Sequence, residues 1–459
     1  MKRRPLVLLV LVCAGWFSGS TAQAEPKSVL FIAVDDLNDW TSYLGGHPQT
    51  KTPNIDALVA RGVSFTNAHC TAPGCNPSRT SLMTGLRPWE TGVYFNPNNA
   101  KPVLRDTQTI NRHFLANGYQ VFGAGKIYHG KTSEGRSDTW TKWGGPKGTK
   151  KTNVHNVNEL NRSHFDWGPL PIETKDMGDA KLTDWAIEKL QKTDPSQPLF
   201  LAVGYVKPHL PWYVPQKYFD RFPIEEIQLP KTIEDDLADI PMAGVKIAKP
   251  TGDHAAVVKG DEWAAAVQGY LATISFLDDQ VGRLMRGLDE SGRANDTVIV
   301  WWSDHGWHLG EKQHWRKFAL WQDATRTSFA VVAPGLTKPG GQCDAPVDYL
   351  SIYPTLCDLA GLSKPSHVTG PSLTELLKDP KSNWDGHAIC THGRGNHAIY
   401  LGDYHLIRYA DGSKEFYNRV DDPHEWKNLV GEKKYQGLIN KMSSRLPDLA
   451  DEELERERS

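Results

Sequence analysis

Apolar segments of strand length recur along the chain, and polar residues follow each of them. The clearest are residues 28–34, 119–124, 199–205 and 297–302. They are rich in β-branched residues and largely continuous rather than alternating, which is typical of strands covered on both faces of a parallel sheet.

Segments with helical periodicity separate these runs. A helix is predicted to begin at Thr52-Pro53 and to stop at Gly62, and longer ones at 179–192 and at about 261–288. Alternation of strands and helices predicts an α/β fold, with a large doubly wound sheet flanked by helices. Ligands bind beyond the carboxyl ends of the strands in such sheets, so the polar residues after each run should share one rim.

The pattern changes near residue 385. Short strands are predicted at 398–401, 404–409 and 415–417, with turns between them, and a helix at 433–446. We therefore expect a large main domain over residues 25–384 and a small C-terminal subdomain, an antiparallel sheet plus a helix, over residues 385–459.

The N-terminus has the pattern of a secretory signal peptide. Three basic residues precede an apolar run at 6–17, and Ala22-Gln23-Ala24 offers a cleavage site. The run is too short to span a bilayer. Residues 1–24 are therefore expected to be removed from a soluble periplasmic or secreted protein with no membrane span.

Charge and cysteine content narrow the functional classes. Removing three basic residues changes the net charge from −2 to −5, which argues against nucleic acid or another polyanion bound by bulk charge. An anionic substrate would need a local cationic pocket. Of five remaining cysteines, the four other than Cys75 either form disulfides or stay as buried thiols.

Three aspartates are expected at the shared rim. Asp35 and Asp36 follow the first apolar run, and Asp304 follows the fourth. Each alone is compatible with a turn or a helix cap, but three carboxylates together repel one another unless a cation neutralises them. Hard oxygen ligands favour Ca²⁺ or Mg²⁺, and flexible carboxylates favour calcium, so we expect one Ca²⁺.

The segment 74–85 combines a cysteine, a proline and an arginine with a predicted helix start. Pro77 disfavours helix at the preceding residue, so the helix is predicted to begin near Pro77 and to end at Gly85, with Cys75 in the turn before it. Free N–H groups there favour an anion. Arg79 would add a planar cation for a tetrahedral oxyanion. The alternative is a buried thiol beside a helix cap.

Cys75-Asn76-Pro77-Ser78-Arg79, followed by Leu-Met-Thr-Gly, resembles the signature of the type I sulfatases of the alkaline phosphatase superfamily. In that family the cysteine is oxidised to formylglycine after translation. The resemblance implies an alkaline phosphatase-like fold, a formylglycine-generating maturation enzyme as partner, and a sulfate ester as substrate.

The resemblance also assigns roles to single residues. It implies that His305 joins Asp35, Asp36, Asp304 and residue 75 at the metal. Lys126 and His129 resemble the pair that holds the formylglycine hydroxyls, and His209 and Lys317 resemble the pair that binds sulfate and the leaving group. Lys312 remains an alternative to Lys317, although the distance from Asp304 favours Lys317.

The mechanism that follows uses hydrated formylglycine at position 75. One hydroxyl, stabilised by the metal and Arg79, attacks sulfur, and His209 or Lys317 protonates the departing alcohol. The second hydroxyl, deprotonated by His129, then expels sulfate. An unmodified thiol could not complete this cycle.

Within the family, the segments of residues 28–335 are most similar to those of the iduronate-2-sulfatases. This implies a 2-O-sulfated uronic acid or a related residue of a sulfated polysaccharide or glycosaminoglycan. Arg394 and His397, in the polar loop 392–397, are expected to reach over the pocket and bind a carboxylate or a neighbouring sugar. Trp212 or Trp307 would offer a surface for stacking a sugar ring.

Three alternatives stay open. One is a sulfatase for another polysaccharide such as ulvan, carrageenan or fucan. Another is a phosphate or phosphonate ester hydrolase of the same superfamily, and the third is an unmatured, non-catalytic protein that binds sulfated glycans.

Overall fold

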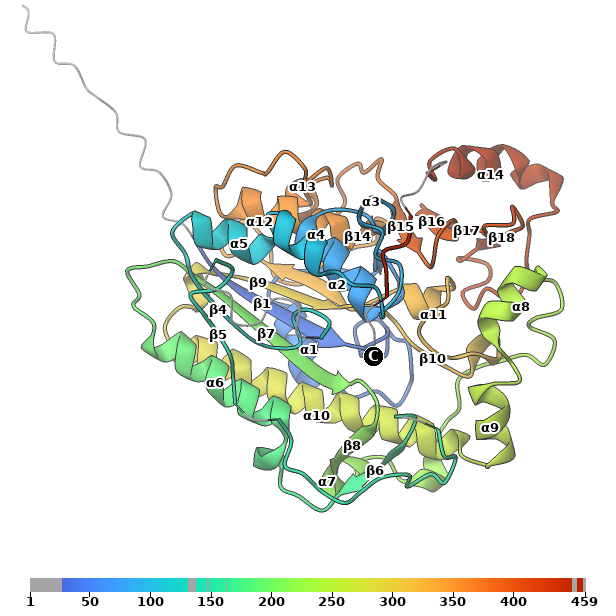
Figure 1. The fold of residues 1–459 in the computed structure, drawn as a ribbon, viewed down its shortest axis with the longest axis horizontal. Helices are drawn as coiled ribbons and strands as arrows, with labels where there is room; N and C mark the ends of the chain where they lie inside the picture. Colours follow the sequence, from blue (N-terminus) through green and yellow to red (C-terminus); the bar gives the residue numbers. More distant parts are fainter. Residues whose placement is uncertain (1–26, 131–137, 147, 163, 448–451, 457–459) are drawn as a thin grey trace, which may run out of the picture.

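An eight-stranded mixed sheet forms the centre of the protein in the computed structural model (Figure 1). The structure describes residues 27–130, 138–146, 148–162, 164–447 and 452–456, so the predicted signal peptide lies outside the described residues. The strands run in the order β13 (Gly341–Cys343), β2 (Val63–Phe65), β12 (Phe329–Val332), β9 (Thr297–Ser303), β1 (Ser28–Asp35), β7 (Leu199–Pro208), β4 (Gln120–Gly125) and β5 (Lys142–Trp143).

The four predicted strands are neighbours in the sheet. β9, β1, β7 and β4 lie side by side and run parallel, so their carboxyl ends meet at one rim. Every residue of β1 is buried, and its side chains alternate between the two hydrophobic cores that cover the sheet. This two-sided burial explains the continuous apolar runs in the sequence.

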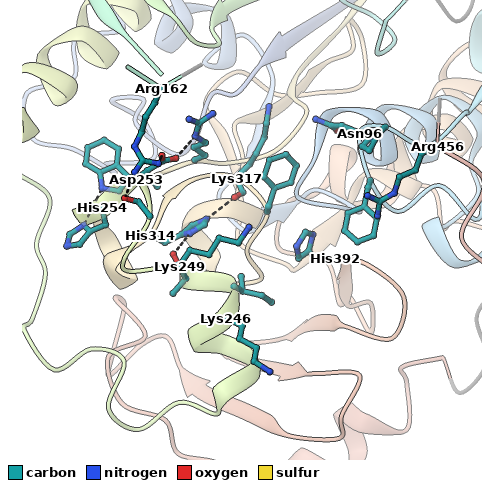
Figure 2. Close-up of a pocket in the computed structure, with 18 residues that line it drawn as sticks. Asn96, Arg162, Lys246, Lys249, Asp253, His254, His314, Lys317, His392 and Arg456 are labelled. Atoms are coloured by element: carbon teal, nitrogen blue, oxygen red, sulfur yellow. Dashed lines mark hydrogen bonds and ion pairs between the residues drawn. The ribbon is translucent and has the colours of Figure 1, made fainter. Parts of the chain in front are cut away.

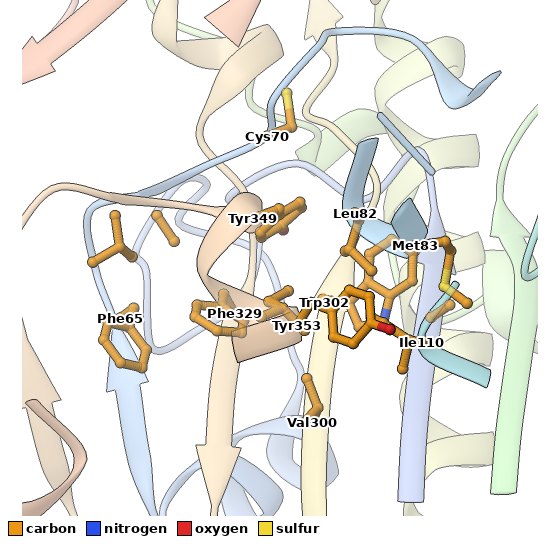
Figure 3. Packing of buried hydrophobic residues seen from close by; sticks show 14 of the residues in the cluster. Phe65, Cys70, Leu82, Met83, Ile110, Val300, Trp302, Phe329, Tyr349 and Tyr353 are labelled. Carbon is orange, nitrogen blue, oxygen red and sulfur yellow. The ribbon is translucent and has the colours of Figure 1, made fainter. Parts of the chain in front are cut away.

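Helices cover both faces, as the alternation of elements predicts (Figure 1). Buried side chains of α2 (Cys75–Thr84), α5 (Ile110–Ala116), α12 (Ile352–Leu359) and α13 (Thr374–Lys378) belong to the first core. Those of α1 (Pro53–Val59), α6 (Gly178–Lys192) and α10 (Trp263–Glu290) belong to the second. In the first core, Leu82 and Met83 of α2 pack beside Trp302 of β9 and Tyr349 (Figure 3).

The C-terminal sheet is antiparallel, as predicted, and has one strand more than the sequence indicated. It runs in the order β15 (Ala388–Thr391), β16 (His397–Leu401), β17 (Tyr404–Arg408) and β18 (Lys414–Asn418). Ile399 and Phe416 face Met442 of α14 (Gln436–Ser443), while Tyr400 and Tyr417 join the first core. Because this sheet completes the main core, the domain boundary after residue 384 stays a prediction.

Shorter elements connect these layers. They are β3 (Ala68–His69), β6 (Trp167–Leu170), β8 (Trp212–Pro215), β10 (His308–Leu309), β11 (Trp315–Arg316), β14 (Val347–Asp348), α3 (Pro88–Thr91), α4 (Lys101–Asp106), α7 (Gln216–Phe219), α8 (Met242–Ala248), α9 (Asp253–Lys259) and α11 (Gln322–Thr325).

The five described cysteines are buried free thiols. Cys70 and Cys390 lie closest to pairing, with their Sγ atoms 3.7 Å apart. Across the ranges that the structure covers, no helix has both the length and the apolar character needed to cross a membrane.

Candidate active site

The predicted site residues meet at the carboxyl ends of the central strands. Asp35 ends β1, Asp304 follows β9, Lys126 follows β4, and His209 follows β7. The strands approach so closely here that a Cβ on Gly125 would lie only 2.1 Å from the carbonyl oxygen of Gly204. Glycine at position 125, with φ +78°, therefore allows Lys126 to enter the rim.

Helix α2 begins two residues earlier than predicted. Cys75 is its first residue rather than part of the preceding turn, while Gly85 ends the helix at φ +72° as expected. Pro77 falls in the first turn, where its missing N–H has no intrahelical acceptor to lose. Asn76 accepts helical geometry because its backbone N donates to Asn96 Oδ1 (3.0 Å) and its Nδ2 to the Asn98 carbonyl (2.7 Å).

Asp35, Asp36, Cys75, Asp304 and His305 form one buried cluster of possible metal ligands. One ligand atom from each lies within 4.8 Å of all the others. Asp36 Oδ2 is buried and has no hydrogen-bond partner among the described residues. Burial raises the pKa of Asp304 to about 7, although Arg79 lowers it, so the protein alone stabilises the charged form of this carboxyl group poorly. The donor set therefore fits a divalent cation.

The ring of His305 is oriented for this role. Nδ1 lies 3.0 Å from the Gly306 carbonyl oxygen and donates to it, which leaves the lone pair on Nε2. Nε2 lies 3.4 Å from Cys75 Sγ and 3.3 Å from Asp36 Oδ1. The geometry is compatible with the nitrogen ligand that the family resemblance implies.

The N–H donors of Arg79 are all used within the protein. Its guanidinium group is fully buried, and all five of its N–H groups are used by acceptors of the protein. Nε donates to Asp304 Oδ2 (2.9 Å), and the other nitrogens donate to Asp35 Oδ1 and to the carbonyls of Val34, Lys126 and Ile127. Arg79 therefore has no donor left for an oxyanion. Its hydrogen bonds position the metal-binding carboxylates, and its stabilisation of negative charge at residue 75 stays a prediction.

Two lysines converge on position 75. Lys317 Nζ lies 2.9 Å from Cys75 Sγ and 2.6 Å from Asp36 Oδ1, and Lys126 Nζ lies 3.5 Å from the same sulfur and pairs with Asp35. Burial alone would raise the pKa of the Cys75 thiol, but the two ammonium groups lower it well below its usual range. Position 75 is thus a site where negative charge is stabilised.

The structure also separates the two candidate lysines. Lys312 is buried in another cluster, where it pairs with Asp236 and with the Glu425 carbonyl. Lys317, which follows β11, is the lysine at the cluster.

His129 and His209, the two histidines predicted to act in catalysis, lie beside the cluster. His129 hydrogen-bonds the Cys75 side chain. His209 Nε2 lies 3.8 Å from Asp36 Oδ2, and its side chain is 32% exposed, so it borders the open side of the site. Its Nδ1 lies 2.6 Å from the Leu210 carbonyl oxygen and donates to it, so Nε2 is the ring nitrogen that faces the cluster.

The loop at 392–397 reaches a pocket, but through another residue. Arg394 is exposed and is not among the residues that line the cleft beside Lys317. His397 is buried on β16, where Thr391 Oγ1 lies 3.0 Å from its Nδ1. His392 lines the cleft instead, because Arg394 lies at the exposed tip of the loop and His397 has entered the sheet. Trp212 and Trp307 are also buried and offer no face for a sugar.

Residues that orient the site were missed by sequence reasoning. Asp179 accepts hydrogen bonds from the backbone N of Val206 and Lys207, and Lys207 Nζ donates to the His209 carbonyl (3.0 Å). Tyr270 OH donates to the Asp36 carbonyl (2.7 Å). Only Lys207 left a signal in the sequence, since it lies in Lys-Pro-His-Leu-Pro beside the predicted His209.

Comparisons with known proteins agree with this geometry. The family model described as Sulfatase matches residues 27–362, and the model described as N-sulphoglucosamine sulphohydrolase, C-terminal, matches residues 310–452. A sulfatase of Formosa agariphila is 40% identical, over 97% of this chain and 92% of its own length. The iduronate 2-sulfatase of Homo sapiens is 30% identical, over 81% of this chain and 76% of its own.

A solved structure shares the fold. It is a protein in complex with its substrate, D-glucosamine-2-N,6-O-disulfate, and it superposes with a TM-score of 0.74 at 20% identity, covering 92% of this chain and 97% of that one. The matched family model, the relatives and the buried cluster around Cys75 lead to one assignment: this chain belongs to the sulfatase family.

Proposed function

We propose that this sulfatase hydrolyses sulfate esters of anionic carbohydrates, with formylglycine at position 75 and one Ca²⁺. The observation that carries the proposal is that Cys75 belongs to the buried cluster of possible metal ligands and is also contacted by Lys126 and Lys317. The 30% identity to an iduronate 2-sulfatase supports a 2-O-sulfated uronic acid as the target sugar. A sulfate ester of another polysaccharide is the alternative within the same chemistry.

The chain's own residues supply most of the required chemistry. Lys126 and Lys317 place positive charge where sulfate oxygens would lie beside residue 75. His209 Nε2 is placed at the open side, where it would protonate the departing alcohol oxygen. Asp35, Asp36, Asp304 and His305 would hold the cation, which polarises the sulfate group when bound. Oxidation of Cys75 to formylglycine would supply the hydroxyl nucleophile.

We also propose that the protein is exported and that a formylglycine-generating enzyme acts on Cys75. The basic and apolar pattern of residues 1–24 supports export. Mass analysis of the peptide that contains Cys75, taken from the native host, would show the thiol side chain converted to an aldehyde, with one sulfur and two hydrogens lost and one oxygen gained. An intact thiol would favour a protein that only binds sulfated glycans.

Matched 4-nitrophenyl sulfate and 4-nitrophenyl phosphate test the reaction class. We expect kcat/KM for the sulfate to exceed that for the phosphate by more than about tenfold, or about 1.4 kcal/mol in barrier. We expect this preference for the sulfate ester because Lys126 and Lys317 lie beside residue 75 and because residue 75 would act as the nucleophile. A preference for the phosphate ester would assign the protein to the phosphate or phosphonate hydrolases of the superfamily.

Removal of divalent ions with a chelator tests the calcium assignment. We expect turnover to stop and the midpoint of thermal unfolding to fall, because Asp35, Asp36 and Asp304 then repel one another at close range. Ca²⁺ should restore both properties better than Mg²⁺, which demands stricter octahedral geometry. The Asp304→Asn variant lacks one of the metal-binding carboxylates, so the chelator should change its turnover and its midpoint of thermal unfolding much less. Unchanged stability and activity after chelation would argue against any metal.

A further inference from the structure

A cleft of about 600 Å³ adjoins the active site (Figure 2). Its lining includes Lys317, which contacts Cys75, and Asn96, which holds the backbone N of Asn76. The cleft therefore continues from the cluster toward the surface. A substrate with its sulfate ester at residue 75 has room here for the rest of the molecule.

The cleft is strongly cationic. Its lining contains one carboxylate, Asp253, and six cationic side chains: Arg162, Lys246, Lys249, Arg316, Lys317 and Arg456. An excess of positive charge in a concave site attracts anions and raises their local concentration. The whole chain has a net charge of −2, so this attraction comes from the local charges of the cleft and not from the bulk charge of the protein.

Most of these cations already have partners. Arg162 and Arg316 both pair with Asp253, at 3.0 and 2.6 Å. Lys317 pairs with Asp36 at the metal cluster, and Arg456 pairs with Glu453 at 3.2 Å. Lys246 lies near Asp411, whose pKa is lowered first by hydrogen bonds from Ser413 and then by the Lys246 charge.

Lys249 is different. Among the residues that the structure describes, its ammonium group has no hydrogen bond and no carboxylate partner. It follows the last residue of α8, where its φ of +51° turns the chain away from the helix, and its backbone N closes the helix on the Val245 carbonyl. Figure 2 shows its side chain in the cleft beside His314.

The neighbours of Lys249 do not compete with an anion. Burial, and then the charges of His314 and Lys249, lower the pKa of His392 to about 4, so that ring is neutral. Phe95 and Phe318 flank His392, with ring centroids at 5.6 and 6.1 Å, and they supply apolar surface of the kind that packs against a sugar ring.

We propose that Lys249 binds a second anionic group of the substrate, a carboxylate or a further sulfate on the carbohydrate, while the sulfate ester to be cleaved lies beside residue 75. The inference rests on the proposed function and narrows it. The enzyme then prefers a polyanionic carbohydrate to a neutral sugar that carries a single sulfate. Lys249, rather than the predicted Arg394, becomes the residue that selects the substrate.

The test compares Lys249→Asn with Lys259→Asn. Asparagine tolerates the positive φ at position 249, and Lys259 is an exposed lysine at the end of α9 that does not line the cleft. The probes are 4-nitrophenyl sulfate as substrate and a trisulfated heparin-type disaccharide as competing ligand. Calorimetric binding of the disaccharide to a Cys75→Ala background provides a readout that does not depend on turnover.

We expect Lys249→Asn to weaken disaccharide binding by about tenfold and to change KM for 4-nitrophenyl sulfate by less than about twofold. Lys249→Arg should retain binding, Lys259→Asn should match the unaltered protein, and added salt should shrink the difference. Equal effects on both probes, no effect on the disaccharide, or no disaccharide binding by the unaltered protein would each overturn the inference. Failure of the unaltered enzyme to hydrolyse 4-nitrophenyl sulfate would instead count against the proposed function.

Discussion

Replacing Cys75 with alanine is expected to lower kcat/KM for an aryl sulfate by at least about 10⁴-fold, because the variant has no nucleophile. Lys126, Lys317 and His305 all converge on the Cys75 sulfur atom, and the alanine methyl group has no oxygen or sulfur to replace it. The fold should persist, since the change removes one small buried atom. The measurement is steady-state turnover, together with the midpoint of thermal unfolding.

Cys343→Ala is the matched control. Its thiol is also buried and free, but it lies on β13 at the edge of the sheet, away from the cluster. We expect this variant to keep full activity. If Cys75→Ala retained more than about a hundredth of the activity, residue 75 would not be the nucleophile.

Arg79→Lys is expected to lower the free energy of unfolding by about 3 to 5 kcal/mol, although the charge is kept. Lysine has three donors on one nitrogen and cannot replace a planar fork that reaches Asp35, Asp304 and three carbonyls. The two carboxylates would lose a buried partner, and the metal ligands would lose their orientation. Urea unfolding measured with and without added Ca²⁺ would detect both effects.

Two observations separate this structural role from sulfate binding. A residue that only bound sulfate would raise KM and leave stability unchanged when altered. Arg105→Lys, in an exposed pair with Asp106, serves as the control and should leave stability unchanged. A loss of stability at Arg79 no larger than at Arg105 would disprove the positioning role.

Much of the architecture was predictable because its signals are local. Burial on both faces makes a central strand continuously apolar, so β1 and β9 could be recognised from short windows of sequence. The position of a polar residue at a strand end is equally local, which is why Asp35 and Asp304 were correctly placed at one rim. The family signature at Cys75 then connected that rim to a reaction.

Sequence by itself thus determined the fold class, the family and which strand ends carry the chemistry. Only the tertiary structure decided which hydrogen-bond donors of the cationic side chains are already occupied and which stay free. Arg79 meets Asp304 and Lys126 across long stretches of chain, so no local pattern could show that its five N–H groups are already occupied. Lys249 likewise enters the cleft because the chain turns at its φ of +51°, directly after α8. There it lies beside His314, which is 65 residues further along the sequence. Backbone propensities act over a few residues, whereas the free or occupied state of a side chain depends on neighbours that only folding brings together.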